Sequence, residues 1–491
     1  MSRSYLKWRV DCFAIGIRLY SPVLSALIPA VCLPNNDDRQ LLFGSGPRNI
    51  GGKDGYDAVE HIAGLDWCSG KIGLAGNSWL AMSQWFIASQ QPPHLAAFSP
   101  WEGASDFYRD TLSRGGVSYD AMWKVLEDAM VRNNKTESCS QMIEKYPLYN
   151  EYWEDKRAKL DKIITPAYVL ASYSSALHTT GSLRAFREIT SKDKWLRIHP
   201  TQEWHDLYSP ESIEELTQFF DYYLKGIDSG WTRTPKVRVS VLGFNKLTLP
   251  PPQKSIVNVK FPSYPPPALN TALYLGPNGS LGTTAATDEA SASYRAEVNP
   301  KDEASVAEEV TFRHKFATPT WLVGYSWIAL HVSSDQDDID VFVQLQKQDA
   351  SGKALQCMNV PLDELIPAVK DASEVADSCF LKYHGPSGVL RASHAGTKVS
   401  KPNAWPEYRN DSQEKIKPGT VVRLEIPIWP TGISFEAGEY LAIKMSGHYM
   451  GFMEFEPLNG ASHRNKGKPT IYFGGKYDSH LVVPLIDPIS V

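Results

Sequence analysis

Apolar and polar positions follow two patterns along the chain, and the change between them divides it. Between residues 50 and 100, and again between 163 and 235, short apolar runs alternate with amphipathic stretches of helical period. The runs predict strands at residues 71–75, 167–171 and 194–198, and the amphipathic stretches predict helices at 56–63, 80–89, 181–189 and 212–224. Helices that alternate with short apolar strands are typical of an α/β fold.

The segment between these two regions has a different pattern. Residues 101–162 are rich in Trp, Tyr and charge, show helical periods at 119–131 and 149–160, and carry almost no strand signal. We therefore expect a helical cap inserted into the α/β region.

From residue 236 onward, short runs with a period of two lie between turns rich in Pro, Gly, Ser and Thr. This pattern predicts strands at residues 237–241, 272–275, 339–345, 420–426, 440–445 and 480–485. Residues 250–267 contain many prolines and are interpreted as a surface loop. Many short alternating strands are typical of a β-sandwich or jelly roll. The predicted organisation is an α/β core at residues 1–100 and 163–235, a cap at 101–162 and a jelly-roll β-sandwich at 236–491.

Composition narrows the classes of partner. With 50 Lys and Arg against 55 Asp and Glu, the net charge of −5 gives no electrostatic case for nucleic acid. The scattered cysteines have no metal-ligand spacing, so we expect no metal and no cofactor. Arg18, Pro22 and Pro29 interrupt the apolar residues 13–33, which favours a buried or irregular segment over a membrane anchor and makes a cytoplasmic protein the default. The oligomeric state stays open, a homodimer included.

The sharpest local signal is the segment GLAGNSWLA at residues 73–81. A strand ends here, Gly76 permits a sharp turn, and a helix begins just beyond Ser78. A serine on such a strand-to-helix elbow is exposed as a nucleophile, with the backbone N–H of Trp79 beside it as an oxyanion donor. Leu80 stands where the second glycine of G-x-S-x-G is usual, and an ordinary helix N-cap is the alternative interpretation of Ser78.

The amino-acid sequence around the elbow resembles that of the cocaine esterase-like (CocE/NonD) hydrolases, relatives of the X-Pro dipeptidyl-peptidases. The resemblance rests on the elbow, on residues 84–85 (QW), and on residues 54–57 (DGYD), 65–71 (LDWCSGK), 91–95 (QPPHL), 100–110 (PWEGASDFYRD) and 477–484 (YDSHLVVP). It spans about residue 51 to the end and implies an α/β-hydrolase core, a helical cap and a C-terminal jelly roll.

The resemblance also implies a serine nucleophile, a histidine base and an acid, and Ser78 falls on the nucleophile position. The family histidine follows a late core strand, where this chain reads IHPTQEWHDL at residues 198–207. His205 matches the histidine if the loop is two residues longer, and Glu203 occupies the unshifted position.

The family acid follows an earlier strand, and Ser174 stands at its position. A serine cannot stabilise an imidazolium by charge, although it can accept a hydrogen bond from it. His178, four residues on, is an alternative base, and Glu203 or Asp206 is an alternative acid.

A second departure lies upstream of the elbow. The family draws an oxyanion-hole tyrosine from a loop before the nucleophile, whereas here only 77 residues precede Ser78 and nothing around Tyr20 resembles that loop. We expect the leading strands to be absent, through truncation or a mispredicted gene start, or replaced by unrelated chain. A missing oxyanion donor lowers turnover by about 10²–10³-fold.

These features lead to two main hypotheses. In the first, the chain hydrolyses an ester or amide of a bulky apolar small molecule, such as a secondary metabolite, through Ser78 and His205. In the second, the scaffold is retained without hydrolysis, as a binding protein or a biosynthetic cyclase or isomerase. An unstable fragment is a third interpretation. The aromatic residues that could line the pocket, with core packing as the alternative, are Trp101, Phe107, Tyr108, Tyr119 and Trp123, and His178 is a further pocket candidate.

Overall fold

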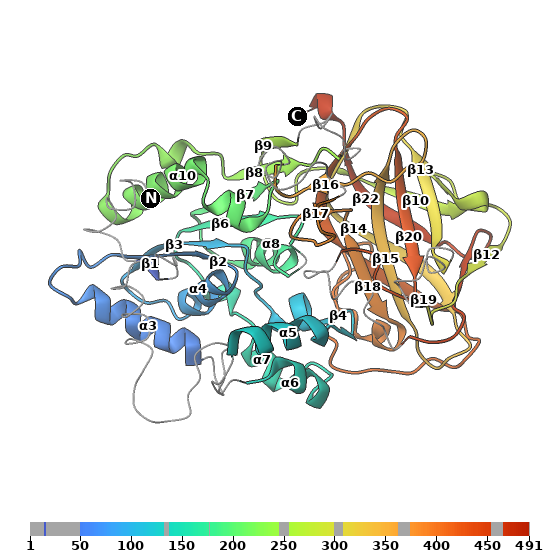
Figure 1. The fold of residues 1–491 in the computed structure, drawn as a ribbon, viewed down its shortest axis with the longest axis horizontal. Helices are drawn as coiled ribbons and strands as arrows, with labels where there is room; N and C mark the ends of the chain where they lie inside the picture. The colour runs from blue at the N-terminus through green and yellow to red at the C-terminus, as the bar shows by residue number, and fades with distance from the viewer. Residues whose placement is uncertain are drawn as a thin grey trace.

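The computed structural model describes residues 14–15, 50–131, 137–175, 177–244, 255–298, 308–361, 374–452 and 465–490. Two sheet systems lie side by side, an α/β region formed by the first half of the chain and a strand-rich region formed by the second half (Figure 1). Residues 1–13 and 16–49, which include Tyr20 and nearly all of the apolar segment 13–33, lie outside the described residues.

The α/β region is built on a seven-stranded sheet of order β1-β2-β3-β6-β7-β8-β9. Neighbouring strands are parallel from β1 to β8, and β9 is antiparallel to β8. The strands are β1 (Ala14–Ile15), β2 (Ile72–Asn77), β3 (Leu95–Trp101), β6 (Ala167–Ser172), β7 (Lys194–His199), β8 (Val237–Val241) and β9 (Ile256–Phe261).

Helices cover both faces of this sheet, as the alternating side chains of β6 show. Val169 belongs to an apolar cluster that includes residues of α3 (Ile50–Ala63), α4 (Trp79–Ser89) and α8 (Thr179–Glu188). Tyr168 points to the other face, into a cluster with residues of α10 (Pro210–Phe220) and η3 (Asp221–Lys225). Parallel strands buried on both faces are nearly continuous apolar runs, which is why their sequence signal is strong.

A mainly helical segment follows β3 and has its own apolar cluster, centred on Trp123 and Trp153. Figure 1 places its helices α5, α6 and α7 below the parallel sheet, next to the strand-rich region. The elements of this segment are η1 (Tyr108–Leu112), β4 (Ser113–Arg114), β5 (Val117–Ser118), α5 (Asp120–Val131), α6 (Cys139–Lys145), α7 (Glu151–Asp155) and η2 (Leu160–Lys162).

The strand-rich region contains a network of eleven hydrogen-bonded strands, in which the long strands β14 and β19 pair from Thr320↔Phe435 to Val332↔Val422. Its strands are β10 (Leu269–Gly276), β11 (Ser280–Gly282), β12 (Ala290–Ser293), β13 (Val310–Lys315), β14 (Thr320–Ser333), β15 (Asp340–Gln348), β18 (Ser387–Arg391), β19 (Val422–Phe435), β20 (Tyr440–Ser446), β21 (Thr470–Phe473) and β22 (His480–Ile486). The shorter elements of the second half are η5 (Pro277–Gly279), β16 (Cys357–Met358), β17 (Lys382–Tyr383), η8 (Ala392–Thr397) and η10 (Pro488–Ser490). Two further short elements, α9 (Glu203–Leu207) and η4 (Trp231–Arg233), lie between β7 and β8 of the α/β region.

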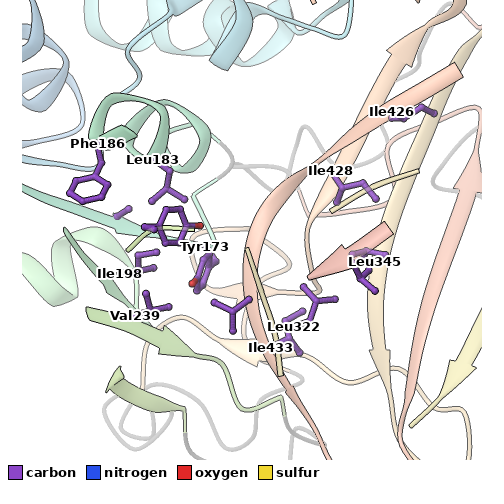
Figure 2. Close-up of a cluster of buried hydrophobic side chains, with 14 of the residues drawn as sticks. Tyr173, Leu183, Phe186, Ile198, Val239, Leu322, Leu345, Ile426, Ile428 and Ile433 are labelled. Atoms are coloured by element: carbon purple, nitrogen blue, oxygen red, sulfur yellow. The ribbon is translucent and has the colours of Figure 1, made fainter. Parts of the chain in front are cut away.

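One apolar cluster continues from the α/β region into the strand-rich region. Figure 2 shows Tyr173 and Val239 of the first near Leu322 and Ile433 of the second. The backbone joins them as well, because Leu242 N–H donates to the carbonyl of Gly432 at 2.8 Å. The two sheet systems therefore share a core.

Each predicted strand coincides with a strand of the structure, but β19 continues to Phe435, beyond the predicted end at residue 426, and α3 begins at Ile50, before the predicted start at residue 56. Several strands, among them β3, β13, β14, β18 and β21, were not predicted.

Three further predictions differ from the structure. The predicted helix 149–160 is only α7 followed by the short turn η2. Residues 237–241 form β8, which joins the parallel sheet and not the strand-rich network. The predicted loop 250–267 contains the edge strand β9, which lies between two groups of prolines and whose residues are mostly exposed. Among the described residues, no helix is both long enough and apolar enough to cross a membrane.

Candidate active site

Ser78 stands on the sharp turn between β2 and α4. Its backbone has φ +53° and ψ −116°, a conformation that non-glycine residues rarely adopt and that costs about 1–3 kcal/mol. Gly76, with φ +150°, makes the turn possible just before it. The Ser78 hydroxyl makes no capping hydrogen bond to α4, so the N-cap interpretation does not account for this serine. Strain of this kind is typical of functional positions.

His178 supplies the histidine partner of Ser78. Its Nε2 lies 3.1 Å from Ser78 Oγ, which is hydrogen-bond distance. His178 follows β6 and immediately precedes α8, and its side chain is buried. Burial, and secondarily the positive charge of Arg114, lower the pKa of His178 to about 3. At neutral pH the imidazole is therefore uncharged and able to accept a proton.

Glu203 is the carboxyl group beside this histidine. It is the first residue of α9, just after β7, and its Oε2 lies 3.9 Å from His178 Nε2. Its other oxygen accepts a hydrogen bond from the side chain of Asn77 at 3.1 Å. Burial, and then the nearby Glu102, raise the pKa of Glu203 well above its ordinary value. Glu203 lies on the Nε2 side of the ring, and the buried Nδ1 has no hydrogen-bond partner among the described residues.

The other candidates for base and acid occupy different surroundings. His205 lies on α9 with a half-buried side chain, and its backbone N–H donates to Gln202 Oε1 at 3.1 Å. Asp206 is buried and pairs with Arg197 Nη2 at 2.5 Å, so its charge is already neutralised. Ser174 is buried, with its Oγ 3.4 Å from Ser172 Oγ. The structure thus brings His178 and Glu203 to Ser78, both of which sequence reasoning named only as alternatives.

The arrangement of these residues follows from the sheet. β6 and β7 are parallel neighbours in which Ser172 is paired with His199, so the loops after them leave the same edge of the sheet. Ser78 leaves that edge too, because β2 is parallel to them. The resemblance implies an acid after β6 and a histidine after β7, whereas this chain has His178 after β6 and Glu203 after β7. Because both loops leave the same edge, the exchanged pair can reach the same point near Ser78. This adjacency is the signal that favours His178, and it is visible only once the strand order is known.

The aromatic candidates separate into three surroundings. The rings of Trp79, Phe107 and Trp123 contact one another, with Phe107 and Trp123 centroids 4.7 Å apart. Tyr108 is buried in the helical segment, with its hydroxyl donating to the Pro147 carbonyl at 2.7 Å. Trp101 packs on the opposite face of the sheet, with Tyr168. The group next to the elbow is therefore Trp79, Phe107 and Trp123, and Tyr119 packs partly buried against the same cluster.

Comparison with known proteins shows which families the chain resembles. Residues 49–138 match the X-Pro dipeptidyl-peptidase (S15) family, and residues 229–482 match the X-Pro dipeptidyl-peptidase C-terminal non-catalytic domain. A Mycobacterium bovis protein named "Putative serine esterase" is 20% identical over 89% of this chain and 79% of its own.

Solved structures show the fold and the family. A CocE/NonD family hydrolase from Staphylococcus aureus superposes with a TM-score of 0.78 and 30% identity, covering 92% of this chain and 78% of the other. An aminopeptidase from the marine sediment archaeon Thaumarchaeota archaeon has the same fold, with a TM-score of 0.63 and 12% identity over 89% of this chain and 80% of its own. The chain therefore has a hydrolase fold and belongs to the CocE/NonD family of serine hydrolases.

Proposed function

We propose that this protein hydrolyses an ester or amide of a bulky small molecule, with Ser78 as nucleophile, His178 as base and Glu203 as the acid. The observation that carries the proposal is the 3.1 Å contact between Ser78 Oγ, on its strained elbow, and His178 Nε2. A nucleophile within hydrogen-bond reach of a neutral imidazole is the arrangement that serine hydrolases require. His178 here replaces His205 as the base. Glu203 takes the place of Ser174 as the group that stabilises the imidazolium, through its charge on the Nε2 side of the ring and not through a hydrogen bond to Nδ1.

The reaction proceeds in two halves. His178 Nε2 takes the proton of the Ser78 hydroxyl while Oγ bonds to the substrate carbonyl carbon, and the carbonyl oxygen becomes an oxyanion. The intermediate collapses, the bond to the alcohol or amine breaks, and that leaving group takes the proton from His178. Water then gives a proton to His178 and attacks the carbonyl carbon of the acyl-enzyme ester. The bond between that carbon and Ser78 Oγ breaks, Oγ takes the proton back from His178, and the carboxylic acid leaves.

Two groups stabilise charge during these steps. The backbone N–H of Trp79 directly follows the nucleophile in the first turn of α4, where the positive end of the helix favours negative charge, and it is the oxyanion donor of this proposal. Glu203, 3.9 Å from His178, stabilises the imidazolium when it is ionised. Burial and Glu102 raise the pKa of Glu203, which opposes its ionisation until positive charge develops on His178.

The surroundings of the site support a bulky apolar substrate. Trp79, which is partly buried, packs against the buried Phe107 and Trp123 and gives the side of the site next to the nucleophile an apolar character. We further propose that residues 101–162 act as a cap over the site and that the strand-rich region, predicted as residues 236–491, is a jelly roll that limits substrate size. β8 and β9 are exceptions within that range, since they belong to the parallel sheet.

Labelling with a fluorophosphonate probe tests the proposal without knowledge of the substrate. We expect the probe to form a covalent adduct at Ser78 and Ser78→Ala to abolish it. Ser83→Ala is the matched control, because Ser83 lies on the same helix, is exposed, and its hydroxyl donates to the Leu80 carbonyl one turn earlier. A wild-type protein that is not labelled at Ser78 would exclude this route. A ligand-induced rise in melting temperature without labelling would favour the binding protein or cyclase instead.

A further inference from the structure

A second layer of buried ionisable groups lies behind Glu203. Glu102 directly follows β3 and has φ +54°, and its backbone N–H donates to the Leu170 carbonyl at 3.0 Å. Its carboxyl group lies in the interior, and only 1% of the residue is exposed. Both oxygens are buried and form no hydrogen bond within the described part of the chain. A buried carboxylate without hydrogen bonds is unfavourable unless a positive charge lies close to it.

His199 is positioned to supply that charge. It is the last residue of β7, its side chain is completely buried, and its Nε2 lies 2.8 Å from Glu102 Oε1. Its ring lies beside Trp101, with centroids 6.4 Å apart. Asp206 Oδ2 is 3.9 Å from the same nitrogen, but Asp206 is already paired with Arg197. Of these two carboxyl groups, Glu102 is therefore the one that pairs with His199.

Glu102 in turn acts on Glu203. Glu102 directly follows Trp101, which is paired with Asn77 at the ends of β3 and β2, and the Asn77 side chain donates to Glu203 Oε1 at 3.1 Å, so the two carboxyl groups lie at the same edge of the sheet. After burial, the charge of Glu102 is the main cause that raises the pKa of Glu203. Two carboxyl groups that share a dry interior do not both ionise readily, because each charge opposes the other. A basic side chain next to Glu102 weakens that opposition, and His199 is that side chain, at 2.8 Å. The contact between His199 and Glu102 thus bears on whether Glu203 can ionise next to His178.

We propose that Glu102 and His199 are positioning residues that set the charge of Glu203 and thereby the pH at which Ser78 becomes reactive. The proposal rests on the function proposed above, since it concerns the same serine, base and acid. The contact with His199 weakens the effect of Glu102 on the ionisation of Glu203. When His199 is replaced by a neutral side chain, Glu102 opposes that ionisation alone.

The charged and polar groups that face this layer come from several elements. Glu203 faces Asn77 of β2, His178 before α8 and Glu102 after β3. His199 faces Glu102 and Asp206 of α9. The outer groups are Arg197 of β7, which pairs with Asp206 and lies 3.7 Å from Glu215 of α10, and Arg114 of β4, which acts on His178.

The pH dependence of fluorophosphonate labelling tests the proposal. We expect the labelling rate to rise with pH as Glu203 ionises, and the two variants to move this rise in opposite directions. Glu102→Gln removes the opposing charge, so the rise occurs at lower pH. His199→Gln leaves Glu102 uncompensated, so the rise occurs at higher pH. A displacement of about one pH unit corresponds to a change of about tenfold in labelling rate at a pH below the midpoint.

His331→Gln is the matched control. His331 lies on β14 in the strand-rich region, and its Nδ1 is 3.7 Å from Asp478 Oδ1. The substitution therefore removes a histidine–carboxylate contact outside the parallel sheet. We expect it to leave the pH profile of labelling unchanged. Melting temperatures of all variants, measured with the same samples, establish that each is folded.

The outcomes separate this proposal from the proposed function. If Ser78 is labelled but the two variants move the profile in the same direction or not at all, the role of Glu102 and His199 is wrong and the function stands. If His199→Gln does not fold, the direction for Glu102→Gln decides, and a profile that stays or moves to higher pH contradicts the proposal. If wild-type Ser78 is not labelled, both proposals fail together.

Discussion

At the scale of single residues, the candidate site depends on burial more than on residue type. His178 and His205 are both histidines in loops or short helices of the same region, yet only His178 is buried against the nucleophile. The same burial removes its positive charge at neutral pH, since its pKa falls to about 3. The sequence identified Ser78 through the glycine and the strand-to-helix change around it. It could not rank His178 against His205, because burial is decided by the neighbouring strands.

The lowered pKa of His178 predicts how stability depends on pH. Between the ordinary value of 6.5 and about 3, the unfolded chain binds a proton at this residue that the folded chain does not. Stability is therefore fully present above pH 6.5 and is lost as pH falls, with a slope of up to about 1.4 kcal/mol per pH unit from this group. We expect His178→Gln to reduce that slope, as measured by urea unfolding between pH 7 and pH 4.

Glu203 contributes with the opposite sign. Because its pKa is raised on folding, the folded chain keeps a proton that the unfolded chain releases above its ordinary value of 4.5, so this group lowers stability as pH rises.

His205→Gln is the control for the His178 variant and should keep the wild-type slope. An unchanged slope in His178→Gln would show that burial of this histidine does not govern the acid sensitivity.

At the scale of elements, close packing between β3 and α4 holds the elbow in place. A Cβ at Gly103, just after β3, would lie 2.8 Å from Ala81 Cβ and 2.9 Å from Met82 N, both on α4. We expect Gly103→Ala to displace the start of α4, to lower stability by about 1–3 kcal/mol and to slow labelling of Ser78. Thermal unfolding and labelling of the same sample measure both effects.

Gly51 on α3 provides the control for this substitution. A Cβ there meets no atom within 4 Å, so Gly51→Ala should leave labelling unchanged and raise stability by up to about 1 kcal/mol. If Gly103→Ala is as stable and as readily labelled as Gly51→Ala, the elbow does not depend on this contact.

Elements also show where sequence reasoning reaches its limit. The alternation of residues 237–241 predicted a strand correctly, but it does not state which sheet the strand joins. β8 joins the parallel sheet because β7 offers it an edge, with Leu196 paired to Val237. The prolines on either side of β9 led to the prediction of a loop there, although prolines are tolerated beside an edge strand. Pairing between distant segments, which no local pattern contains, decided both cases.

At the scale of the whole molecule, the α/β region and the strand-rich region behave as one structure. A Cβ at Gly432 of β19 would lie 2.7 Å from the carbonyl of Ser240 in β8 and 2.8 Å from Tyr173, so the two sheet systems meet without space between them. The order of the modules was predicted from changes of periodicity along the chain. Their shared core was not, because each module satisfies its own pattern.

The central claim is that Ser78 is activated by His178. The most direct measurement is the rate of fluorophosphonate labelling at Ser78, mapped by mass spectrometry, in the wild type, His178→Gln and His205→Gln. We expect a loss of about 10²–10⁴-fold in His178→Gln, the range of general-base catalysis, and a rate close to wild type in His205→Gln. The opposite pattern, with labelling retained in His178→Gln and lost in a folded His205→Gln, would contradict the account.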